Sequence, residues 1–187
     1  GDTDFGNWQW GGTLIVHELH QEPNGELTVR VPESVAAAFN KPVEHVFHSS
    51  VGHVTTDNDI VHIKSPGIFS ASITQSMPYR CKIETTIIFE KGTKSCGLML
   101  RTSDDYEQTY YIRLEPPAHR MVFDLWPRKT NDVPFMPELE RKIKLLPGVP
   151  VRIQMLIDGT VGTLYMNNKI AMSFRLYNHR SGGWGVF

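Results

Sequence analysis

The sequence is short of cysteine, of long apolar runs and of surplus charge of either sign. Its 187 residues include two cysteines, Cys81 and Cys96, which are too few for a disulfide scaffold. If the strands on either side of Lys91-Gly92 pair as a hairpin, Cys81 lies opposite a position well beyond Cys96. We therefore expect two free, mostly buried thiols.

The near balance of charge argues against two classes of partner. Nineteen basic and 20 acidic residues leave a formal net charge of −1, and no run of Lys or Arg makes a local exception. A surface of this kind lacks the electrostatic basis for binding nucleic acid or an anionic membrane. No apolar run approaches the ~20 residues that a membrane-spanning helix needs. We therefore expect neither nucleic acid nor a membrane as a partner. We favour a secreted or periplasmic bacterial location over a cytoplasmic one.

The clearest pattern lies between residues 150 and 177. Apolar residues occupy every second position from Val151 to Ile157, and again from Ile170 to Leu176. Asp158-Gly159 and Asn167-Asn168 separate three such segments with residues that tolerate positive φ. The pattern predicts a three-strand meander with one buried face, and a second sheet must cover that face.

The rest of the chain favours the same architecture. Turn residues at 22–25 predict an opening hairpin over residues 13–31. Residues 34–39 can form a helical turn, and the His-rich segment 40–59 is predicted to be a loop with short strands. Short alternating segments then follow from residue 79 to the end. The prediction is an all-β fold, a two-sheet antiparallel β-sandwich of the jelly-roll or concanavalin A-like kind.

Two regions carry a resemblance to a known family. The stretch 8–35 resembles the end of the propeller of glycoside hydrolase family 32, with a W-x-G-x-L strand, a turn with G-x-L and a terminal P-x-x-E-L-like segment. The matching residues are Trp10, Gly12, Leu14, Glu18, Leu19, Gly25, Leu27, Pro32 and Glu33. The region 79–187 is similar to the C-terminal β-sandwich of that family and to carbohydrate-binding module family 66, through G-L-x-L-R, D-G, Y-x-N-x-K and G-x-W-G motifs.

The resemblance implies a division of the chain and a role for it. Residues 1–39 would be the terminal hairpin of a propeller-type catalytic domain plus a linker, and residues 40–187 the β-sandwich. The family's catalysis needs two carboxylates beside the glycosidic bond, and the motifs that carry them do not occur in this sequence. We therefore expect a non-catalytic accessory domain, with the propeller and an oligo- or polysaccharide as partners. A free-standing sugar-binding module or lectin and a purely structural sandwich remain alternatives.

One set of side chains suits a sugar. Charged groups can hold vicinal hydroxyls, and an aromatic ring can lie on the C–H face of a sugar. Alternation places five such residues on the outward face of the second-half sheet: Glu84, Arg101, Tyr111, Arg113 and Asp124. The same face could instead be plain solvent-exposed surface, or could dock on the propeller.

Other candidate sites have weaker support. Trp8, Trp10, Trp126 and Trp184 could stack on sugars, but burial in the core or at a domain seam is the favoured interpretation. His17 and His20 would point to opposite faces of a strand, so they cannot chelate one metal ion together. We expect no cofactor, although the acidic turns at 57–59 and 104–105 could bind Ca²⁺. No G-x-S-x-G motif supports a serine hydrolase.

Overall fold

The computed structural model describes residues 14–127 and 139–187. Within these ranges the chain forms strands almost throughout, with a five-residue helix α1 at Glu33–Ala37 and a 3₁₀ turn at Pro116–Ala118. The strands of the first half are β1 (Glu18–Gln21), β2 (Leu27–Arg30), β3 (Phe47–Val51), β4 (His53–Asp57), β5 (Ile60–Lys64), β6 (Ala71–Ser76) and β7 (Arg80–Ile87). Those of the second half are β8 (Cys96–Thr102), β9 (Thr109–Glu115), β10 (Arg120–Trp126), β11 (Leu139–Lys142), β12 (Val151–Asp158), β13 (Val161–Met166), β14 (Ile170–Arg175) and β15 (Gly183–Val186).

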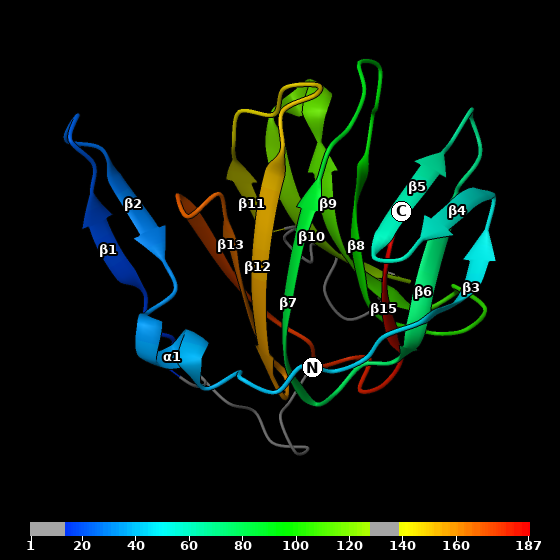
Figure 1. The fold of residues 1–187 in the computed structure, drawn as a ribbon, viewed down its shortest axis with the longest axis horizontal. Coiled ribbons are helices and arrows are strands. Elements are labelled where there is room, and N and C mark those ends of the chain that lie inside the picture. Colours follow the sequence, from blue (N-terminus) through cyan, green and yellow to red (C-terminus); the bar gives the residue numbers. More distant parts are fainter. Residues whose placement is uncertain (1–13, 128–138) are drawn as a thin grey trace.

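Two antiparallel sheets stack face to face, which confirms the predicted β-sandwich (Figure 1). The larger sheet has seven strands in the order β11-β10-β9-β8-β15-β6-β3, and the smaller has four in the order β14-β13-β12-β7. The predicted meander is confirmed, because β12 pairs with β13 and β13 with β14. The turn before β13 has Gly159 at φ 61°, and the next turn has Asn167 and Asn168 at φ 53° and 52°. Only residues that tolerate positive φ suit these turns.

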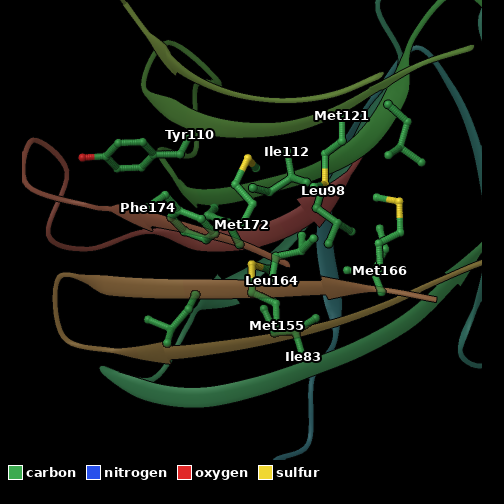
Figure 2. Packing of buried hydrophobic residues seen from close by; sticks show 14 of the residues in the cluster. Ile83, Leu98, Tyr110, Ile112, Met121, Met155, Leu164, Met166, Met172 and Phe174 are labelled. Carbon is green, nitrogen blue, oxygen red and sulfur yellow. The ribbon is translucent and has the colours of Figure 1, made fainter. Parts of the chain in front are cut away.

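The core lies between the two sheets. Strand alternation sends every second side chain inward, so β9 contributes Tyr110, Ile112 and Leu114, and β12 contributes Ile153 and Met155. These five side chains are at most 2% exposed, and Figure 2 shows Ile112 of the larger sheet facing Met155 of the smaller. Burying each such side chain stabilises the fold by about 1.5–3 kcal/mol.

The smaller sheet covers only part of the larger one. It lies over β8 to β11, whereas β15, β6 and β3 continue beyond its β7 edge (Figure 1). The core cluster between the two sheets accordingly has no member from β6 or β3, and Trp184 and Val186 of β15 are only partly buried against it. Ala71 and Ile73 of β6 belong instead to a second buried cluster with Met99. This uncovered part of the larger sheet borders an open crevice, which Phe47 and Trp184 help to line.

The pairing expected around Lys91-Gly92 is wrong. β7 and β8 do not form a hairpin, because β7 joins β12 in the smaller sheet while β8 lies between β9 and β15 in the larger. The intervening residues therefore cross from one sheet to the other. Cys81 and Cys96 are nevertheless both free and partly buried, as expected.

Two small hairpins lie outside the sandwich sheets. β1 and β2 pair around the predicted turn, in which the Gly25 N–H donates to the Glu22 carbonyl at 2.8 Å. β4 and β5 pair at the opposite side of the molecule (Figure 1). The helical turn predicted at 34–39 is α1. No helix of the described ranges is long and apolar enough to span a membrane.

Candidate functional site

Three of the five predicted sugar-binding residues meet on the outer face of the larger sheet. Because Tyr110 and Ile112 point into the core, the alternate residues Tyr111 and Arg113 of β9 point outward. The antiparallel register places Asp124 of β10 directly opposite Tyr111, and Arg113 lies two pairs further along, opposite Val122. Directly opposite residues lie about 4.5–5.5 Å apart at Cβ and diagonal neighbours about 7–8 Å apart, so the three side chains form one surface.

Arg113 is held by carboxylates on both sides. Its Nε donates to Glu115 at 2.7 Å and its Nη1 to Asp124 at 3.2 Å. Arg120 of β10 donates from Nε to the other oxygen of Glu115 at 2.6 Å and from Nη1 to Glu140 at 2.7 Å. The guanidinium group is thereby fixed in a preorganised charged patch, which we call the Arg113 network (Arg113, Glu115, Asp124, Arg120 and Glu140).

The network sets the charge state of Glu115. Burial raises the pKa of this carboxyl group, but the hydrogen bonds from Arg120 and Arg113, with their positive charges, lower it by more, so the net shift is downward. The patch therefore keeps ionised acceptors beside fixed guanidinium donors at neutral pH, and this pairing suits the hydroxyl groups of a polyol.

Aromatic side chains border the charged patch. The ring of Tyr111 meets Phe187 edge-on, with centroids 5.0 Å apart, and Phe69 stacks on Phe187 at 6.3 Å. Tyr106 packs against Phe69, and its hydroxyl donates to Ser49 Oγ at 3.2 Å. Burial raises the pKa of Tyr111, so its hydroxyl stays protonated. Phe69 is 45% exposed, which leaves apolar surface available beside Phe187.

Trp126 adds an exposed ring to the same face. It lies two residues beyond Asp124 on β10, about 7 Å along the strand, and is 50% exposed. Trp126 is therefore not buried in the core of the described residues, whereas Trp184 packs against the core as expected. Trp8 and Trp10 lie outside the described residues.

The prediction of a sugar-binding role is wrong for Arg101, because its side chain is 3% exposed and points inward. Gly183 pairs with Thr102 and Trp184 with Leu100, so Arg101 is the extra residue of a bulge, with φ 50°. Because of the bulge, the side chain of Arg101 points to the inner face of the sheet, although strict alternation along the strand would place it on the outer face. The guanidinium donates to the carbonyl oxygens of Leu176 at 2.9 Å, of His179 at 2.8 Å, and of Gly159.

Glu84 does not join the other residues either. It lies on β7, in the smaller sheet, where Gln154 donates to it at 2.8 Å and Lys82 approaches at 3.1 Å. The expectation of one common face is wrong for Glu84, since the two sheets turn their outer faces in opposite directions.

Sequence reasoning missed several neighbours of the site. Glu115 and Arg120 follow from the alternation of β9 and β10 and could have been included. Phe69 and Phe187 could not, because they reach Tyr111 only through the insertion of β15 between β8 and β6. Among the described residues, no three His, Cys, Asp or Glu side chains are grouped so that they could hold a metal ion.

Comparison with solved structures shows that the fold is shared with other proteins. It matches the carbohydrate-binding module CBM66 from Bacillus subtilis with a TM-score of 0.58 and 13% identity, over 75% of this chain and 87% of that module. It matches the exo-inulinase from Aspergillus awamori with a TM-score of 0.59 and 10% identity, over 91% of this chain. The chain spans only 31% of that enzyme's length.

These likenesses confirm, at the level of fold, the resemblance predicted from the sequence. Sequence identities this low show a shared architecture, and a shared architecture does not by itself define a ligand. No protein-family model matches the sequence. A search of curated proteins found no match either.

Proposed function

We propose that the chain is a non-catalytic, sugar-binding accessory domain of a larger glycoside hydrolase that resembles family 32, acting on fructose-containing or related glycans. The observation that carries the proposal is the surface made by Tyr111, Arg113 and Asp124 on two adjacent strands. It combines fixed donors, ionised acceptors and, in Trp126, an exposed ring, within a fold shared with a carbohydrate-binding module.

The first hairpin supports the accessory role. Its polar face turns inward, because Thr28 is fully buried and donates to Glu22 at 3.1 Å. Its apolar face turns outward, leaving Leu19 at 69% and Leu27 at 65% exposure. This arrangement is the reverse of the usual one for a hairpin. It is the arrangement expected if a neighbouring sheet of the parent protein covers Leu19 and Leu27.

The hairpin is also fixed to the sandwich. The Val29 N–H donates to the carbonyl of Lys169, in the turn before β14, at 3.1 Å. His17 Nδ1 and the Tyr165 hydroxyl form a second hydrogen bond at 3.0 Å. A catalytic domain docked on the hairpin would therefore be held in a defined position next to the sandwich, and we propose such a domain as the protein partner.

Calorimetric titration of the chain with levan, inulin, sucrose and fructose tests sugar binding. We expect saturable binding to at least one of them, weakened by tenfold or more in Arg113→Ala, because the network loses its central donor. Arg152→Ala is the matched control, since it removes an exposed guanidinium group from the outer face of the smaller sheet. Binding unchanged by Arg113→Ala would contradict the site.

A purely structural domain is the second candidate, favoured by the apolar face of the hairpin alone. It predicts no heat of binding with any of the four sugars. It also predicts that joining the chain to its parent catalytic domain stabilises both parts, and that Leu19→Ser removes this gain.

A further inference from the structure

One continuous crevice leads away from the candidate sugar site. Its lining includes Tyr111, Arg113 and Phe69 on the outer side of the larger sheet, and Phe47 and Trp184 on the inner side. It is also lined by residues 91–97, at the crossing from one sheet to the other, and by residues 60–67 of β5 and the following loop. The crevice therefore passes from the outer face to the part of the inner face that the smaller sheet leaves uncovered.

The size of the crevice exceeds the need of a single sugar. Its volume is about 2760 Å³, whereas sites for one small ligand usually measure roughly 300–1,000 Å³. The side of the crevice that β7 forms is also accessible. The inward-facing residues Thr85 and Ile87 of β7 are only partly buried, whereas Ile153 and Met155 of the adjacent β12 are 2% and 0% exposed. A ligand of several units fits this space.

A second group of aromatic rings lies at the inner end. His45 and Phe47 pack against Trp184 with centroids 5.3 and 5.6 Å away, at tilted or edge-to-face angles. The His45 side chain is 37% exposed. Trp184 lies in β15 and Phe187 directly follows this strand, about 10 Å further along the chain, and the two residues lie at opposite ends of the crevice. Aromatic surface therefore borders both ends of the path.

We propose that this crevice binds an extended glycan chain. The end of the chain occupies the surface made by Tyr111, Arg113 and Asp124. The following units run between residues 91–97 and 60–67 to the rings of His45, Phe47 and Trp184. The inference rests on the proposed sugar-binding function and names the ligand as a chain instead of a single sugar. An extended polypeptide pairing with the β7 edge fits less well, because a paired strand cannot follow a path around the end of a sheet, whereas a glycan can bend at each linkage.

The test is calorimetric titration with fructose and with inulin-type and levan-type oligosaccharides of two to eight units. We expect the affinity for at least one series to rise about tenfold from the single sugar to the longer chains and then level off. In His45→Ala/Phe47→Ala this gain should disappear while the affinity for fructose is unchanged. His53→Ala is the matched control, because it removes an exposed histidine that does not line the crevice.

The outcomes separate the two proposals. No binding of any sugar overturns the proposed function and this inference with it. Binding that depends on Arg113 but does not increase with chain length, or an increase that persists in the double variant, overturns this inference alone. If the double variant does not fold, His45→Ala by itself, at an exposed position, should still reduce the gain, and an undiminished gain would again overturn the inference.

Discussion

The side chain of Arg101, from the larger sheet, donates a hydrogen bond to the main-chain carbonyl of Leu176, which follows the last strand of the smaller sheet, at 2.9 Å. Two more carbonyl oxygens, of His179 and Gly159, accept from the same guanidinium. One buried cation thus connects the two sheets and satisfies three main-chain acceptors. The residue predicted to bind sugar instead holds the sandwich together.

Arg101→Ala should therefore destabilise the fold strongly. It leaves three carbonyl groups without their donor in a buried place, and we expect a loss of about 3 kcal/mol or more in the free energy of unfolding. Arg101→Lys should rescue little, because an ammonium group cannot reproduce the planar fork of donors. Urea unfolding measures the effect. Arg80→Ala, which breaks an exposed ion pair with Asp158, is the control and should change stability little.

Trp126→Ala should weaken sugar binding without loss of fold. The ring is half exposed, so its removal takes little from the core, but it removes the stacking surface beside Asp124. We expect roughly tenfold weaker binding, measured by calorimetry. Tyr79→Ala removes another exposed ring, 62% exposed and outside the site, and should leave the affinity unchanged. Equal effects of the two substitutions would argue against a stacking role.

Glu115→Gln should remove part of the acid sensitivity of the protein. The pKa of Glu115 is lowered in the folded state, so its contribution to stability is complete above the ordinary pKa of a glutamate and is lost as the pH falls through the folded value. The variant should be less stable than the parent at pH 7, and the difference should shrink below about pH 4. Urea midpoints measured from pH 7 to pH 3 would show this, and a constant difference would contradict it.

Both cysteines should be slow to react in the native state. Burial raises the pKa of Cys81 and of Cys96 to about 11. At pH 8 only about one thiol in a thousand is then ionised, and the thiolate is the reactive form. A thiol reagent should label neither residue over minutes in buffer and both in urea. Fast labelling of one native thiol would contradict the burial seen here.

Leu19→Ser/Leu27→Ser should leave the isolated chain as stable as before. Both side chains already face solvent, so we expect a change in the free energy of unfolding within about 0.5 kcal/mol. Self-association through the exposed apolar face should decrease, as sedimentation would show. Ile88→Ser, at an exposed position on the sandwich, is the control for a general gain in solubility. A double variant that unfolds would show that the hairpin face is already part of a core.

Three features could be predicted from the amino-acid sequence alone: the all-β architecture, the meander of β12 to β14, and the face shared by Tyr111, Arg113 and Asp124. These are local properties: a period of two assigns side chains to faces within a strand, and residues such as Gly159 fix where the chain turns. The network around Arg113 could be predicted for the same reason, since β9 and β10 are adjacent both in sequence and in space.

The partners of β7 and β15 could not be predicted in this way, because they depend on the tertiary structure. The placement of Glu84 and Phe187 depends on these partners. Partner choice depends on how two whole sheets bury their apolar faces, so the neighbour in sequence, β8, need not be the partner of β7. Arg101 shows the same limit at a single residue. One extra residue opposite Gly183 and Trp184 reverses the alternation, and a charge expected in solvent becomes the buried link between the two sheets.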